Sequence, residues 1–134
     1  MPRQIKPVET EKITMNLGYV DLGRIDLLVE EGFYTNRTDF LRTAVRAQLD
    51  RHGPEVGALV ERRVLDMGLR DITRAELEAA QQAGEMLHVK VVGLARLAAD
   101  ISPDLARQTI AAIHVLGALQ APPDVKEILA DRIR

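Results

Sequence analysis

Three polar side chains, Lys12, Thr14 and Asn16, stand at alternate positions near the start of this 134-residue sequence. The residues at positions 13, 15 and 17 are apolar, and this alternation is typical of a β-strand with one face in water. Lysine, threonine and asparagine can hydrogen-bond to the edges of DNA bases, and a ribbon of two antiparallel strands fits the major groove of B-DNA. The three side chains are therefore candidates for base contacts, although such a pattern is more often only a solvated face.

A lone strand over Lys12–Leu17 needs a hydrogen-bonding partner, because its backbone N–H and C=O groups must bond to something. No other strand is predicted between this segment and His52. The simplest partner is the same strand of a second chain, paired antiparallel. The polar side chains would then point outward, and Ile13, Met15 and Leu17 would face the helices below. The sequence thus predicts an obligate homodimer.

Two helices are predicted after the strand. Gly32 ends the first, which is expected to begin late, near Val20 or Asp21, because two glycines surround its start. Thr35 is the expected N-cap of the second, with Asn36 as the alternative, and His52-Gly53-Pro54 ends it. The apolar stripes of the two helices are Leu22, Ile25, Leu28 and Val29, then Phe40, Leu41, Ala44, Val45 and Leu49.

With these elements in place, residues 11–51 resemble the ribbon-helix-helix family of DNA-binding proteins, the CopG/Arc/MetJ type. The resemblance rests on the alternating strand, on the stretch Asp26–Gly32 and on the stretch Tyr34–Arg42, which contains the turn that opens the second helix. It implies base contacts from Lys12, Thr14 and Asn16. It also implies that Thr35, Asn36, Arg37 and Thr38 bind a phosphate, which agrees with the positive end of the helix dipole. The predicted dimer core is Ile13, Met15, Leu17, Ile25, Leu28, Phe40, Leu41 and Val45.

The charge of residues 1–52 weighs against strong phosphate binding. Eight Lys/Arg and eight Asp/Glu cancel, and affinity for DNA grows with the number of phosphates neutralised. Arg3 and Lys6, on an expected flexible arm over residues 1–10, could reach the flanking backbone. The leading hypothesis is a transcriptional regulator, most simply a repressor, that binds double-stranded DNA as a homodimer or higher oligomer. The alternatives are a self-assembling scaffold that keeps the fold only for dimerisation, and an antitoxin.

The rest of the chain predicts an α+β, mostly helical protein. Residues 53–85 are expected to form linker helices: one with an apolar stripe from Val56 to Met67, ended by Gly68, and a short one between the Thr73 cap and Gly84. Residues 86–134 are expected to form a small strand-helix-strand-helix piece for oligomerisation or sensing, with strands over Leu87–Leu97 and Ile110–Leu119. Its two halves form a weak internal repeat. Two such units are too few to close a core, so this piece is expected to need a partner surface, either the same piece of other subunits or the middle helices.

No other chemistry is indicated. Without cysteine, and with His52, His88 and His114 as the only histidines, a metal sensor is disfavoured, and neither a metal nor another cofactor is expected. Catalytic motifs are missing, and Asp100, Asp104 and Glu127 have no constellation around them, so no enzyme is expected. The sequence has no run of apolar residues long enough to cross a membrane and nothing like a signal peptide, which favours a soluble, cytoplasmic protein.

Overall fold

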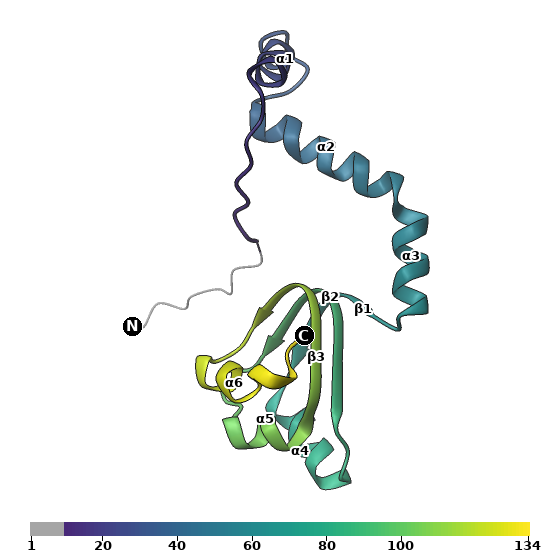
Figure 1. The fold of residues 1–134 in the computed structure, drawn as a ribbon, viewed down its shortest axis with the longest axis vertical. Helices are drawn as coiled ribbons and strands as arrows, with labels where there is room; N and C mark the ends of the chain where they lie inside the picture. The colour runs from purple at the N-terminus through teal and green to yellow at the C-terminus, as the bar shows by residue number, and fades with distance from the viewer. Residues whose placement is uncertain (1–9) are drawn as a thin grey trace. The chain divides into compact units, whose positions relative to one another are not determined.

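The computed structural model describes residues 10–134, which form two compact units divided between Val56 and Gly57. The expected flexible arm, with Arg3 and Lys6, lies outside the described residues except for its last position. Figure 1 shows the elements in chain order, and the two units are described separately below.

The N-terminal unit consists of a segment without regular structure followed by helices. Residues 10–18 form neither helix nor strand in the single chain. Helix α1 covers Tyr19–Glu30 and α2 covers Arg37–Arg51, while α3 (Gly53–Arg62) begins in this unit and ends in the next. Helix α1, whose start lies between two glycines, therefore begins slightly earlier than the expected Val20 or Asp21, with Gly18 as its N-cap.

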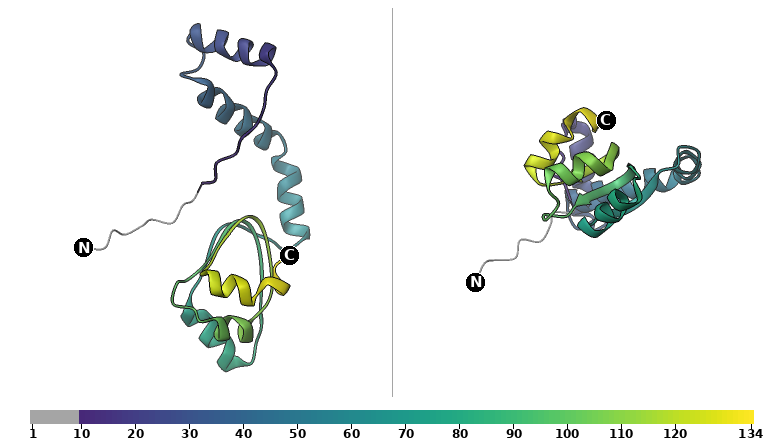
Figure 2. Two further views of the ribbon diagram at one scale, coloured as in Figure 1. Left: turned by 60° about the vertical axis from the view of Figure 1, so that its left-hand side comes forward. Right: turned by 90° about the horizontal axis from the view of Figure 1, so that it is seen from below.

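The C-terminal unit is built from three consecutive strand–helix pairs. The strands β1 (Asp66–Ile72), β2 (Leu87–Leu97) and β3 (Ile110–Gln120) form one parallel sheet in the order β1-β2-β3. The helices are α4 (Arg74–Ala83), α5 (Pro103–Thr109) and α6 (Pro123–Ile128), and a short 3-10 helix, Ala130–Arg132, follows. Figure 2 shows the strands as neighbouring arches with the helices closing their open ends.

The three strands bend at aligned glycines. Gly68 lies opposite Gly93, and Gly93 lies opposite Gly117, and all three have φ between 119° and 135°. A Cβ atom on Gly93 would overlap the carbonyl of Gly68, and one on Gly117 would overlap the carbonyl of Gly93. Glycine is required at both positions by the left-handed backbone and by the close approach of the neighbouring strand.

The core of this unit lies inside the arches. Leu77 of α4, Leu105 of α5 and Val125 of α6 pack with the inward side chains of the strands, such as Val91 and Ile113. Residues 86–134 thus pack on the middle helix α4, which is one of the two partner surfaces expected for them. The strand that precedes this helix, and so the first strand–helix pair, was not predicted.

That first pair corrects the prediction for residues 53–85. A helical stripe was expected to run to Met67 and to end at Gly68, but α3 ends at Arg62 and residues 66–72 form β1. Gly68 is a bend within a strand rather than a helix stop. The second helix of that stretch is confirmed: the Thr73 hydroxyl accepts from the Glu76 amide at 3.2 Å, and Gly84 ends α4 in the left-handed conformation. The predicted strands Leu87–Leu97 and Ile110–Leu119 are confirmed, the latter with one more residue.

Candidate nucleic-acid interface

The segment that carries the predicted base contacts is exposed along its length. Lys12, Thr14 and Asn16 are all exposed, and so are two of the apolar residues between them: Ile13 is 84% and Met15 60% accessible. Within the described residues, the backbone of residues 10–17 makes no backbone hydrogen bond. A strand requires a hydrogen-bonded neighbour, so the expected ribbon between two chains stays a prediction that one chain cannot display.

The turn between α1 and α2 has the predicted form. Gly32 adopts a φ of 87°, and the amide of Phe33 donates to the carbonyl of Leu28 at 2.9 Å, which ends α1 in the manner typical of a C-terminal glycine. The aromatic rings of Tyr34 and Phe40 then meet edge to face with centroids 5.0 Å apart. These contacts fix the angle at which α2 leaves the turn.

The cap of α2 is Asn36 and not Thr35. The side-chain oxygen of Asn36 accepts from the amide of Asp39 at 2.8 Å, and the carboxylate of Asp39 accepts from the amide of Thr35 at 2.9 Å. This reciprocal pair is a variant of the capping box, in which Asp39 accepts from the residue before the cap. The alternative cap in the sequence analysis is therefore confirmed and Thr35 was wrong. The amides of Arg37 and Thr38, in the first turn, have no acceptor among the described residues.

The side chain of Arg37 is held by Asp26. Nε and one terminal nitrogen of Arg37 donate to the two carboxylate oxygens of Asp26, each at 2.8 Å. The hydrogen bond from Arg37 lowers the pKa of Asp26, and the same bond raises the pKa of Arg37. The pair ties the start of α2 to α1, and Asp26 partly neutralises the cation expected to meet a phosphate.

Five of the eight predicted dimer-core residues surround one hollow. It has a volume of about 320 Å³ and is lined by Leu17, Ile25, Leu28, Phe40 and Leu41 together with Asp21 and Arg24. Ile13, Met15 and Val45 do not line it and are exposed in the single chain. Among the described residues of this unit only Ile25 is a buried apolar side chain.

Two carboxylates of this interface were missed by sequence reasoning. Asp39 stands three residues after Asn36, and this spacing is the signature of a capping box, so its role could have been predicted. Asp26 is eleven residues from Arg37 and no local pattern links them. Their contact depends on how α1 and α2 pack.

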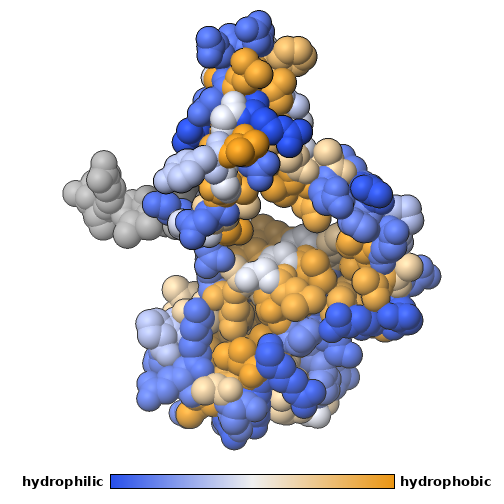
Figure 3. Space-filling model, turned by 45° about the horizontal axis from the view of Figure 1, so that its top comes forward, coloured by the Kyte–Doolittle hydropathy of each residue, from blue (hydrophilic) through white to orange (hydrophobic). Residues whose placement is uncertain are grey.

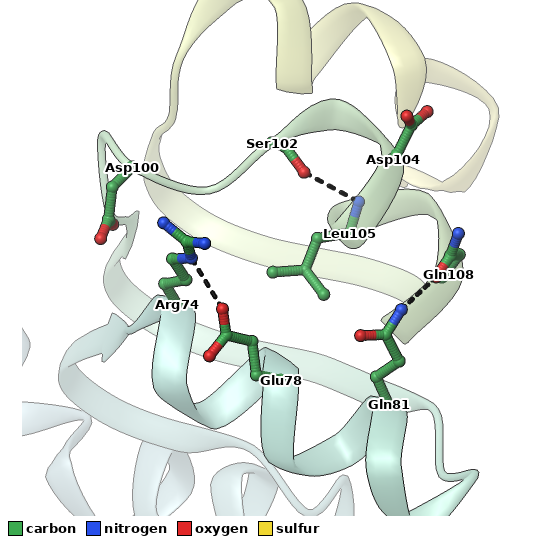
Figure 4. A pocket seen from close by; sticks show the side chains of 8 residues that line it. All are labelled: Arg74, Glu78, Gln81, Asp100, Ser102, Asp104, Leu105 and Gln108. Carbon is green, nitrogen blue, oxygen red and sulfur yellow. Dashed lines mark hydrogen bonds and ion pairs between the residues drawn. The ribbon is translucent and has the colours of Figure 1, made fainter.

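A second hollow lies in the C-terminal unit between α4 and α5. Figure 4 shows its lining, which includes the Arg74–Glu78 pair at 2.7 Å and the bonded amides of Gln81 and Gln108. Asp100 and Asp104 also line it. The Gln81–Gln108 bond joins the two helices, whereas the Arg74–Glu78 pair lies within α4, and these contacts indicate a packing role.

The histidines do not gather. His114 lies 3.2 Å from a terminal nitrogen of Arg63, and His52, at the end of α2, lies beside Gln48 of α2 and Glu55 of α3. Over residues 10–134, no three side chains of the types that bind metals come together.

In the N-terminal unit an exposed alternating segment precedes two helices that a capped turn joins. This order of elements defines the ribbon-helix-helix class, and comparison with known proteins agrees. Residues 8–126 match the model of the Ribbon-Helix-Helix transcriptional regulator family, and the chain belongs to this family. The match includes most of the C-terminal unit. The chain is also similar to the transcriptional regulator CdrS of Halobacterium salinarum, with 31% identity over 48 residues, which are 36% of this chain and 87% of that protein.

No solved structure matches the chain. No helix among residues 10–134 has the length and apolar character needed to cross a membrane.

Proposed function

We propose that this regulator is a non-catalytic repressor that binds double-stranded DNA as a homodimer and inserts a two-stranded ribbon into the major groove. The observation that carries the proposal is the exposed segment 12–17, in which polar and apolar side chains alternate beside an unfilled apolar hollow. Its membership of a family of transcriptional regulators supports a role in gene control.

The ribbon would satisfy two deficits of the single chain at once. Pairing residues 12–17 of two chains gives their backbone groups partners. It also turns Ile13, Met15 and Leu17 toward the hollow lined by Ile25 and Phe40, where their burial contributes about 1.5–3 kcal/mol for each large apolar side chain. Lys12, Thr14 and Asn16 then project from the opposite face toward base edges. Asparagine suits adenine, lysine suits guanine, and threonine suits either kind of edge or a thymine methyl.

The start of α2 would position the dimer on the backbone. The amides of Arg37 and Thr38 lack acceptors in the described chain and lie at the positive end of the helix dipole. The side chains of Thr35, Asn36 and Thr38 are exposed at the same turn. Because Asp26 holds the Arg37 side chain, the proposal gives the phosphate contact chiefly to these amides, with Arg37 as a partly neutralised cation.

The test is DNA binding by the full chain, measured by fluorescence anisotropy on the region upstream of its own gene and on a scrambled duplex of the same length. The double variant Lys12→Ala/Asn16→Ala should lose the preference for the first duplex. Lys90→Ala, which removes one exposed positive charge from the C-terminal unit, is the matched control and should keep the preference. A folded dimer that shows no salt-sensitive, sequence-preferring binding at low ionic strength contradicts the proposal.

A variant at the helix start separates positioning from base reading. Arg37→Ala should weaken binding to both duplexes alike and lower the slope of log affinity against log salt by less than the one unit of a free cation, because Asp26 already holds Arg37. Loss of preference in this variant, with the slope unchanged, contradicts the assigned role.

A scaffold role is the second candidate, and one observation favours it. The first strand of the C-terminal sheet has a free edge with exposed apolar side chains, as described below. An antitoxin is less well supported, because a tail that wraps a toxin is usually disordered when free, whereas residues 57–134 have a closed core.

A further inference from the structure

One edge of the C-terminal sheet is covered by another segment of the described chain, and the other edge is not. At the β3 edge the chain end returns: Ile133 forms a bridge with Ile113, and the amide of Arg134 donates to the carbonyl of Ile113 at 2.8 Å. At the β1 edge no described segment pairs with the strand. Stacked repeats need a cap at each end, so β1 is the unprotected end of this stack.

The space beside Gly68 also shows that the β1 edge is open. The hydrogen side of Gly93 and of Gly117 faces the carbonyl of the preceding strand, but space for a Cβ on Gly68 is open. Gly68 nevertheless keeps the left-handed backbone, with φ of 119°. A further strand can therefore approach β1 closely at this point.

The side chains beside Gly68 are apolar and exposed. Met67 is 66% and Leu69 52% accessible, whereas Val92 and Leu94, their neighbours on β2, are only partly accessible. Figure 3 shows apolar side chains gathered on this unit's surface. The apolar rows that cross the sheet thus end at an edge where nothing in the described chain covers them.

We propose that β1 pairs antiparallel with β1 of a second copy of this chain, about a twofold axis at Gly68. The segment Asp66-Met67-Gly68-Leu69-Arg70 is self-complementary about its glycine. In this register Met67 lies opposite Leu69 of the partner subunit, and Asp66 lies opposite Arg70 of the partner subunit. An interface with twofold symmetry requires this reciprocity, since each contact occurs twice.

The backbone agrees with the register. The carbonyl of Ile72 points toward β2, where it accepts from the amide of Ala98 at 3.0 Å. Because backbone groups alternate along a strand, those of Asp71, Leu69 and Met67 point away from β2, to the free edge. The two Gly68 residues then form a non-hydrogen-bonded pair, in which Cα atoms approach to about 4.5 Å.

The charges favour the same register. Asp66 is exposed, and Arg70 donates to Glu76 and to the carbonyl of Asp71 in its own chain while its side chain stays about one-third accessible. Its guanidinium has five N–H groups, which leaves donors for a second carboxylate. Shifting the axis by one residue to Leu69 would place Arg70 opposite Gly68 and remove the pairing of opposite charges.

The alternative is head-to-tail stacking of β1 on the β3 edge of another copy. The chain end already occupies part of that edge at Ile113. Head-to-tail contacts also leave a free edge on each new copy and so generate open chains, whereas pairing about a twofold axis closes. This contact lies outside the N-terminal unit, and its test does not depend on DNA binding.

The experiment uses disulfide crosslinking, since the sequence has no cysteine of its own. The variants Met67→Cys and Leu69→Cys, on full-length chains with different affinity tags, are expressed singly and together and then oxidised mildly. Positions 67 and 69 of two copies lie opposite at about 5.5 Å between Cα atoms, within disulfide reach. Two copies of position 67, or two copies of position 69, are diagonal neighbours across the ribbon, about 7–8 Å apart. Co-expression should therefore give a crosslinked heterodimer as the main product, and either variant alone should give only traces.

Two further sets of variants test the head-to-tail alternative and the charge pairing. Leu116→Cys takes the place of Leu69→Cys in one co-expression, because Leu116 lies in the row of Met67 at the far edge and reports head-to-tail stacking. Asp66→Arg, added to the crosslinking pair, should lower the yield more than Asp66→Asn does. Circular dichroism verifies that each variant is folded. Crosslinking of Met67→Cys to Leu116→Cys, or no crosslinking by folded Met67→Cys and Leu69→Cys, overturns the inference.

Discussion

Among the described residues of the N-terminal unit one apolar side chain, Ile25, is buried, whereas the C-terminal unit buries thirteen in one cluster. Both units contain amphipathic helices, so the difference is not one of composition. In the C-terminal unit each strand has a neighbour in its own chain, and the sheet closes a core. In the N-terminal unit the described residues before α1 form no strand and pair with no other segment of the single chain. One unit closes a core within a single chain, and we propose that the other does so with a second chain.

Truncation of a core side chain in the C-terminal unit should have the largest effect. Leu77 of α4 is fully buried, so Leu77→Ala should lower the free energy of unfolding of that unit by about 2–5 kcal/mol. Urea denaturation followed by circular dichroism measures this. Leu27→Ala, at an exposed leucine of α1, is the control and should change little. Equal losses in the two variants would erase the contrast between the units.

A glycine series tests how the strands approach one another. Gly93→Ala combines a left-handed φ of 135° with overlap on the Gly68 carbonyl and should cost at least about 3 kcal/mol. Gly68→Ala carries only the backbone strain, about 1–3 kcal/mol. Gly57→Ala, in helix α3 with open space around it, should stabilise by up to about 1 kcal/mol. Thermal unfolding ranks the three, and any other order contradicts the stacking described.

An apolar residue of the exposed segment tests the N-terminal unit. Ile13→Asn leaves the single chain almost untouched, since Ile13 is exposed there. If Ile13 covers the helices of a dimer, the change should cost about 1.5–3 kcal/mol per chain and make α1 and α2 exchange amide hydrogens faster. Hydrogen–deuterium exchange at several protein concentrations measures this, with Lys12→Ala as the control. Unchanged exchange in Ile13→Asn would show that the segment covers nothing.

The smallest expected effect concerns the charge at the start of α2. Asp26→Asn should free Arg37 for phosphate and make the salt dependence of DNA binding steeper by up to about one unit for each Arg37 released. The control is Asp50→Asn, which removes an exposed carboxylate at the other end of α2. If the two variants bind alike at every salt concentration, the Arg37–Asp26 pair does not limit the phosphate contact.

The sequence predicted elements whose signals are local. Thr73 and Gly84 mark helix ends by their own chemistry, and Leu87–Leu97 is a strand with the predicted bounds. The strand β1 was missed because the apolar spacing through Met67 fits a helix, and Gly68 can either stop a helix or bend a strand. Only the alignment with Gly93 and Gly117 decides between these, and that alignment is a property of the sheet.

The candidate interface was also predicted only in part. The capped turn at Asn36 and the hollow around Ile25 follow from the resemblance and from apolar spacing. The pair Arg37–Asp26 could not be predicted, because it joins residues on two helices whose packing the sequence does not specify.

The central claim is that residues 12–17 pair with the same segment of a twin chain. Residue-resolved hydrogen exchange by NMR tests it most directly, at a concentration where the mass in solution is that of a dimer or larger. The account predicts that alternate amides between Lys12 and Leu17 are protected, and that dilution removes the protection. Free-peptide exchange rates at all six amides in such an assembly would contradict it.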